Sequence, residues 1–187
     1  MRLTTSLTLI LLAAVPLAAC DNDAATNDAA TTPAAAEAAG DKPLAEGIAA
    51  DSKFGAALKS AGLDATLAGP GPYTVLAPSD AAFDKMPAGA LDALLKPEAR
   101  ADLTALLTYH ILPGAILAED IGKAIDAGEG KAVLATMGGG TLTATREGNA
   151  IVLSDAAGAK ARVVEADDRR SNGVLHRIDT VLMPGQA

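Results

Sequence analysis

Gly71-Pro72-Tyr73-Thr74-Val75-Leu76-Ala77-Pro78-Ser79-Asp80-Ala81-Ala82-Phe83 is the stretch from which the fold is best inferred. Its Gly-Pro pair favours a turn, and the short run Tyr73–Ala77 that follows has the composition of a strand. Pro78 ends this predicted strand, because proline has no N–H to donate to a sheet ladder. The stretch therefore predicts a short strand that gives way to a different element at Ser79.

The residues after Pro78 predict a helix that carries its own cap. Ser79 can accept a hydrogen bond from an N–H of the first turn, and Asp80 places a negative charge at the positive end of the helix dipole. Phe83 lies one helical turn further on and is expected to point toward the core. We interpret Pro78, Ser79, Asp80 and Phe83 as residues that hold local structure.

Helical patterns dominate the first half of the chain, and strand patterns dominate the second. Ser52 is expected to cap a helix that ends at Gly62. From Lys131 onward, apolar and polar residues alternate with a period of two, up to a last predicted strand over Val174–Met183. This order predicts an α+β fold instead of alternating βαβ units. Tyr73–Ala77 must then join the sheet that the later strands form.

The start of the chain has the pattern of an exported lipoprotein. Residues 1–19 are predicted to be a signal peptide, because Arg2 is followed by an apolar run too short to span a bilayer. Leu17-Ala18-Ala19-Cys20 resembles the bacterial lipobox, in which the cysteine is acylated and becomes the new N-terminus. Cleavage after Ala19 without acylation is the alternative. Cys20 is the only cysteine, so no internal disulfide is expected.

Residues 20–42 are expected to form a tether between the acylated Cys20 and a folded domain. The stretch contains Ala, Thr, Asp and Asn and no large apolar residue, so it cannot offset the entropy of ordering and is predicted to be disordered. Asp21 resembles a retention signal of enteric bacteria and favours the inner membrane over the outer. The predicted location is therefore the periplasmic or cell-surface face of the envelope.

Two later stretches complete a pattern that resembles the fasciclin (FAS1) domain. They are Tyr109-His110 and the closing run Asn172-Gly173-Val174-Leu175-His176, continued by Ile178-Asp179, Val181-Leu182 and Pro184. The resemblance places the domain at residues 43–185. It implies a twisted, wedge-like β-structure with a cluster of short helices, and a role in adhesion or matrix contact. The residues expected to hold that shape are Tyr73, Pro78, Ser79, Asp80, Phe83, Asn172, Gly173, His176 and Asp179.

The Tyr109-His110 pair is the candidate for partner binding. The resemblance implies a role in integrin binding, as in animal members of the family. In this chain the pair follows Leu106 and Leu107, a setting that favours a buried pair with hydrogen-bond partners of its own. His176 shares the alternation of its predicted strand with neighbouring apolar residues, which favours a structural histidine.

Composition and motifs exclude several other functions. The net charge is −8, and the pair Arg169-Arg170, next to two aspartates, is expected to lie in a solvated loop, so nucleic-acid binding is not predicted. Two distant histidines, His110 and His176, with Cys20 acylated, give no metal-site spacing, and no cofactor motif occurs. No Gly-x-Ser-x-Gly elbow is present, and Ser79 has a capping role.

We therefore expect a noncatalytic module that binds a protein or matrix polymer not identified by the sequence. A carrier or sensor of a small apolar ligand is the alternative, and an unrecognised hydrolase built on Ser79 and His110 is a third. The oligomeric state is left open.

Overall fold

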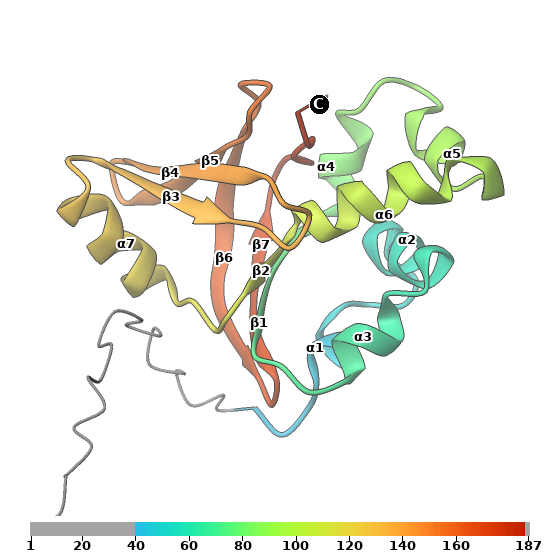
Figure 1. The fold of residues 1–187 in the computed structure, drawn as a ribbon, viewed down its shortest axis with the longest axis horizontal. Coiled ribbons are helices and arrows are strands. Elements are labelled where there is room, and N and C mark those ends of the chain that lie inside the picture. The colour runs from blue at the N-terminus through green and yellow to red at the C-terminus, as the bar shows by residue number, and fades with distance from the viewer. Residues whose placement is uncertain (1–39, 186–187) are drawn as a thin grey trace, which may run out of the picture. The chain divides into compact units, whose positions relative to one another are not determined.

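The computed structural model describes residues 40–185, which form a domain of short helices and a mixed β-sheet (Figure 1). The predicted signal peptide, Cys20 and most of the predicted tether lie outside the described residues. Within the last residues assigned to the tether, the Lys42 carbonyl accepts a hydrogen bond from the Ser171 N–H at 2.9 Å. The ordered domain thus includes chain before Pro43.

Seven α-helices and one 3₁₀-helix are found in residues 40–185, and all but one precede Ile111. None of these helices has the length and apolar character needed to cross a membrane. They are α1 Leu44–Gly47, α2 Lys53–Ala61, α3 Asp64–Ala68, α4 Asp80–Asp84, α5 Ala90–Leu94, η1 Pro97–Ala99, α6 Arg100–Tyr109 and α7 Ala118–Ala127.

Seven strands of the described region form one sheet in the order β2-β1-β7-β6-β5-β4-β3. β1 runs parallel to β7, and every other neighbouring pair is antiparallel. The Met137 N–H donates to the Ile111 carbonyl at 2.8 Å, which brings the end of β3 to β2 and gives the sheet a barrel-like closure. The strands are β1 Tyr73–Pro78, β2 Ile111–Pro113, β3 Lys131–Ala135, β4 Thr141–Glu147, β5 Ala150–Ser154, β6 Lys160–Arg170 and β7 Gly173–Ile178.

The predicted α+β class is confirmed, with helices mainly in the first half and strands in the second. The expected junction of Tyr73–Ala77 with the later sheet is also confirmed, because β1 pairs with β7 from Tyr73↔Gly173 to Pro78↔Ile178. Pro78 is the last residue of β1 in the structure, so the strand extends one residue beyond the prediction.

Two details of the second half differ from the prediction. The last strand ends at Ile178 and not at Met183, because the Asp179 side chain takes the Arg162 N–H at 2.8 Å in place of a backbone carbonyl. Arg169 and Arg170 do not lie in a loop. They end β6 and pair with the first residues of β7, so the connecting turn is reduced to Ser171 and Asn172.

The strands β1 and β7 separate two apolar cores. Successive side chains of a strand point to opposite faces, so Val75 and Ala77 pack against the helices of the first half, whereas Leu76 points into the barrel-like part of the sheet. In β7, Leu175 faces the helices and Ile178 faces the barrel. The same two central strands therefore hold both cores together.

Candidate functional site

Tyr109 lies at the end of α6 and is 1 % exposed. Its hydroxyl donates to the Thr141 carbonyl at 2.8 Å, and burial raises the pKa of the phenol. The glycine-rich β3–β4 connection covers the ring closely: a Cβ on Gly140 would lie 2.5 Å from the Tyr109 ring. The glycine is therefore needed to let the loop cover the tyrosine.

His110 follows Tyr109 and is completely buried. Its Nδ1 donates to the Leu106 carbonyl at 2.8 Å, and its Nε2 accepts the Leu182 N–H at 3.1 Å, which requires the neutral Nδ1–H tautomer. The Phe54 ring lies at a centroid distance of 6.2 Å. Burial lowers the pKa of His110 to about 4, against the opposing effect of the Leu106 carbonyl. Contact between this pair and a partner would thus require local opening.

His176 is also buried, and it fixes the connection between β2 and α7. Its Nε2 donates to the Ile116 carbonyl at 2.8 Å, and its Nδ1 accepts the Asp167 N–H at 3.2 Å. Burial lowers its pKa. Asp167, a residue with φ of 61°, accepts the Ala118 N–H at 2.8 Å at the first turn of α7. Both histidines are therefore neutral structural residues, and they have opposite tautomers.

The residues around Pro78 join two helices. The Ser79 hydroxyl accepts the Ala82 N–H at 3.3 Å, as expected for a cap of α4. Asp80 lies in the first turn of α4, as expected, but its carboxylate accepts the Lys53 N–H at 2.9 Å and so caps α2. Phe83 is 5 % exposed and belongs to the core on the helical side.

Asn172 forms a clamp between segments that are far apart in the sequence. Its Oδ1 accepts the Leu44 N–H at 2.7 Å, and its Nδ2 donates to the carbonyls of Leu67 and Gly69 at 2.8 and 2.7 Å. The next residue, Gly173, has no room for a side chain, because a Cβ would lie 1.9 Å from the Tyr73 carbonyl oxygen. The start of α1 and the end of α3 are thereby held against the beginning of β7.

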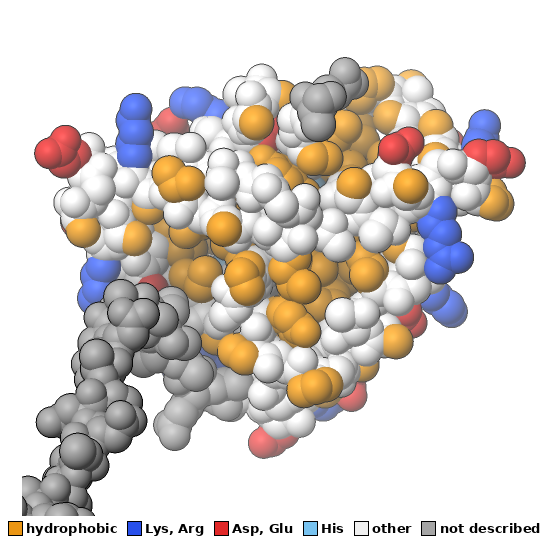
Figure 2. Space-filling view, in the orientation of Figure 1, with side chains coloured by type: hydrophobic (Ala, Val, Ile, Leu, Met, Phe, Trp, Pro, Cys, Tyr) orange, Lys and Arg blue, Asp and Glu red, His pale blue; other side chains and the backbone are white. Residues whose placement is uncertain are grey.

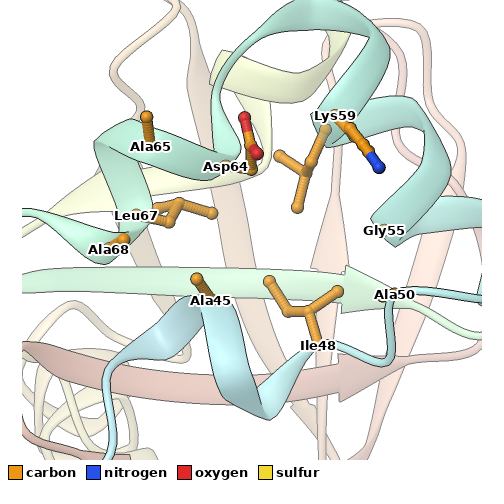
Figure 3. A pocket seen from close by; sticks show the side chains of 10 residues that line it. Ala45, Ile48, Ala50, Gly55, Lys59, Asp64, Ala65, Leu67 and Ala68 are labelled. Atoms are coloured by element: carbon orange, nitrogen blue, oxygen red, sulfur yellow. The ribbon is translucent and has the colours of Figure 1, made fainter.

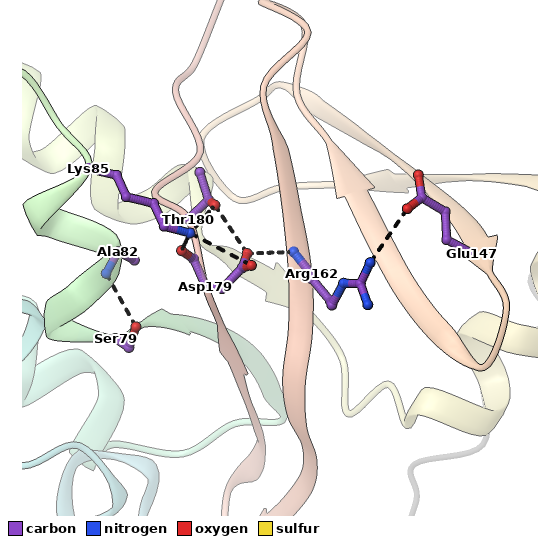
Figure 4. A network of polar contacts seen from close by, with 7 residues as sticks. All are labelled: Ser79, Ala82, Lys85, Glu147, Arg162, Asp179 and Thr180. Carbon is purple, nitrogen blue, oxygen red and sulfur yellow. Dashed lines mark hydrogen bonds and ion pairs between the residues drawn. The ribbon is translucent and has the colours of Figure 1, made fainter.

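Asp179 is the centre of a polar network at the other end of β7 (Figure 4). It accepts the Arg162 N–H at 2.8 Å and the Thr180 hydroxyl at 3.1 Å, while its other oxygen lies 3.7 Å from Lys85 Nζ. Burial opposes ionisation, but these hydrogen bonds and the two cations outweigh it and lower the pKa of Asp179. The Arg162 guanidinium also lies 3.7 Å from Glu147. Asp179 thus links β7 to β6 and to the end of α4.

The hydrolase hypothesis requires Ser79 to be activated by His110. Both ring nitrogens of His110 are engaged by backbone groups, so neither is free to accept a proton from a serine. The Ser79 oxygen accepts a backbone hydrogen bond at its own helix. Within residues 40–185, no group of three or more His, Cys, Asp or Glu side chains could hold a metal ion.

A cavity of about 350 Å³ lies between α1, α2 and α3. Figure 3 shows Ala45, Ile48 and Leu67 directed into it, with Lys59 and Asp64 at its rim. Asn172 holds two of its walls in place, because its side chain joins the start of α1 to the end of α3. The sequence does not predict this cavity, because no capping side chain marks the start of α3, which forms one of its walls. The lining residues are Ala45, Ile48, Ala50, Gly55, Leu58, Lys59, Asp64, Ala65, Leu67 and Ala68.

Comparison with known proteins identifies the family. The model of the fasciclin domain matches residues 50–184. The chain belongs to the fasciclin domain family. This match confirms the resemblance stated from the sequence, and it contains the Tyr73–Phe83 stretch, Tyr109-His110 and the closing run from Asn172.

Two relatives show how this fasciclin domain occurs in other proteins. Protein sll1483 of Synechocystis sp. is 39% identical over 129 residues, which are 69% of this chain and 64% of that protein. The transforming growth factor-beta-induced protein ig-h3 of Sus scrofa is 40% identical over 133 residues, which are 71% of this chain and 17% of that protein. The chain therefore spans less than two thirds of the length of either relative.

Among solved structures, the FAS1 domain pair of the insect cell adhesion molecule fasciclin I aligns with a TM-score of 0.49 and 24% sequence identity. The alignment covers 68% of this chain and 40% of that chain. The assignment to the family rests on the match of the fasciclin domain model.

Proposed function

We propose that this fasciclin protein is a noncatalytic interaction module, held at the envelope by a lipid on Cys20, that binds a protein or matrix polymer through its surface. The observation that carries the proposal is that both histidines and Tyr109 are buried and bonded to backbone groups. These three side chains could perform acid–base chemistry, but they hold the fold instead. We therefore assign binding to the surface of the domain.

The surface supports this proposal. Figure 2 shows one face on which apolar side chains gather at the centre, while most Lys, Arg, Asp and Glu side chains lie toward the margin. An apolar centre within a polar rim is typical of protein interfaces. Four large apolar side chains are also notably exposed among the described residues: Val133, Met137, Val164 and Met183.

Photo-crosslinking from the surface in the native cell tests the interaction. A photoreactive amino acid is placed at Val133, Met137, Val164 or Met183 in separate variants, and captured proteins are identified by mass spectrometry. We expect one partner to be captured reproducibly from one or two of the positions and not from the others. Absence of capture from all four positions, together with turnover of any metabolite by the purified chain, would contradict the proposal.

Attachment through Cys20 is tested separately. Cys20→Ala removes the thiol that would be acylated, so the variant should leave the membrane fraction and lose incorporation of labelled palmitate. Asp21→Ser is the matched variant, which keeps the cysteine. If the Cys20→Ala protein stays with the membrane, the lipid anchor is wrong, whereas the interaction through the surface remains open to the crosslinking test.

A second candidate is a carrier of a small apolar ligand, which the cavity between α1, α2 and α3 favours. Its volume of about 350 Å³ falls in the range of small-molecule sites, of roughly 300–1,000 Å³. Ala45→Trp would fill the cavity from its wall, because Ala45 points into it (Figure 3), whereas Ala56→Trp changes an exposed position of α2 outside it. Native mass spectrometry should then show a bound molecule on the wild type and on Ala56→Trp, and none on Ala45→Trp.

A further inference from the structure

The chemistry of Asn172 depends on the residue that follows it. An asparagine followed by glycine is prone to spontaneous deamidation, because no side chain shields the backbone nitrogen of the glycine. Within residues 40–185 the other asparagine is Asn149, which is exposed but precedes Ala150. Asn172 and Asn149 thus form a matched pair, one with a reactive neighbour and one without.

The fold restrains the carboxamide of Asn172. Its oxygen and nitrogen bond to Leu44, Leu67 and Gly69 at 2.7–2.8 Å, and these partners are 103 to 128 residues away in the sequence. Attack on the side-chain carbon requires the carboxamide to rotate toward the following nitrogen. It can rotate only after these three bonds have broken, which separates the start of α1 and the end of α3 from β7.

We propose that Asn172 is a site of spontaneous deamidation that the folded domain holds unreactive, and that its product cannot rebuild the clamp. The Gly173 backbone nitrogen attacks Cγ of Asn172 and loses its proton. The Cγ–Nδ2 bond breaks and ammonia is released, so that a five-membered succinimide ring remains. Water then opens the ring to aspartate or isoaspartate. One water is consumed and one ammonia is released, with no oxidation or reduction.

The product cannot restore the contacts. A carboxylate accepts hydrogen bonds but donates none, so the product cannot form the two hydrogen bonds that Asn172 Nδ2 donates to the carbonyls of Leu67 and Gly69. One oxygen would face these two carbonyl oxygens in a partly buried site, which is repulsive. Isoaspartate also lengthens the main chain beside Gly173, where a Cβ would already lie 1.9 Å from the Tyr73 carbonyl oxygen.

This arrangement makes each opening of the clamp a chance for irreversible damage. A chain whose clamp opens frequently is deamidated and loses its native state, whereas a chain whose clamp stays closed keeps it. The clamp also holds two walls of the cavity between α1, α2 and α3, so deamidation should abolish any binding there.

Peptide mapping by mass spectrometry tests the kinetic part on the full-length chain at neutral pH. The conversion of Asn172 is followed in the folded chain, in the urea-unfolded chain and in a peptide of residues 168–178. We expect the folded chain to convert roughly tenfold or more slowly than the other two, and low urea below the unfolding transition to speed its conversion. Asn149 should convert slowly in every sample. Conversion of Asn172 in the folded chain at the peptide's rate would overturn the proposal.

The product is tested with Asn172→Asp, and Asn149→Asp serves as its control. The first variant should unfold at a clearly lower urea concentration than the wild type or fail to fold, and the second should match the wild type. Equal stability of Asn172→Asp and the wild type would overturn the claim about the product. The kinetic test uses the unchanged chain, so it stands even if the variant does not fold.

Discussion

At the scale of single residues, His110 couples the stability of the domain to pH. The folded protein keeps the imidazole neutral, with a pKa of about 4 against 6.5 for the ordinary group. Well above pH 6.5 the imidazole is neutral in both the folded and the unfolded chain, so its contribution to the free energy of unfolding is complete. As the pH falls from 6.5 to 4, the unfolded chain binds a proton that the folded chain does not, so stability should fall by about 3 kcal/mol.

The His110→Gln variant isolates this contribution. Glutamine does not titrate. Between pH 7 and pH 4 the free energy of unfolding of the variant should therefore change by about 3 kcal/mol less than that of the wild type. Urea unfolding at a series of pH values measures the difference. Carboxylates titrate in both proteins and cancel in the comparison. Parallel pH curves for the two proteins would show that the folded chain protonates His110 as readily as the unfolded chain.

Tyr109 tests whether the Tyr-His pair contacts a partner or supports the fold. Tyr109→Phe removes the hydrogen bond to the Thr141 carbonyl and leaves the ring in place, so it should cost about 1 kcal/mol of stability. Because the hydroxyl is buried, partner capture in the crosslinking experiment should be unchanged. A loss of capture at unchanged stability would instead place Tyr109 in the interface.

At the scale of elements, α2 is capped by a residue of another helix. Asp80→Ala removes the acceptor of the Lys53 N–H and should cost about 0.5–2 kcal/mol. Asp84→Ala is the control, because it removes an exposed ion pair with the Lys53 side chain and should cost at most about 1 kcal/mol. Urea unfolding of both variants checks this order. The reverse order would mean that the cap contributes less than the ion pair.

The elements also show what could be predicted from the sequence. Ser52 and Ser79 cap their helices, and Gly62 ends α2 with a φ of 78°, all as predicted, because caps depend on residues within one turn. The end of β7 was not predictable, because it depends on Asp179 replacing a backbone acceptor for Arg162, 17 residues earlier.

For the candidate site, the sequence indicated which residues hold the fold but not most of their hydrogen-bond partners. The prediction that His176 is a structural histidine agrees with its hydrogen bonds to two backbone groups. The role of Asp80 at α2 and the three-way clamp of Asn172 were not foreseen, since their partners lie 27 to 128 residues away. A turn signal such as Asn172-Gly173 gives the position of the turn but not the distant groups that its side chain binds.

At the scale of the whole domain, the shared strands β1 and β7 should make the two cores unfold together. Leu107 is fully buried on the helical side and Leu142 inside the barrel. Leu107→Ala and Leu142→Ala should each cost about 2–5 kcal/mol, the range for removing a buried leucine side chain. Since alternate residues of the same strands line both cores, damage to either core should loosen the other.

Hydrogen exchange read by mass spectrometry distinguishes joint from separate unfolding. We expect either variant to speed exchange in both α6 and β4 and to leave a single urea transition, as small domains usually show. Val133→Ala, at a side chain that is 71 % exposed, should change neither. If Leu142→Ala speeds exchange only in the barrel strands and α6 keeps its protection, the helical side is stable on its own. The strands β1 and β7 would then join two independent units instead of coupling them.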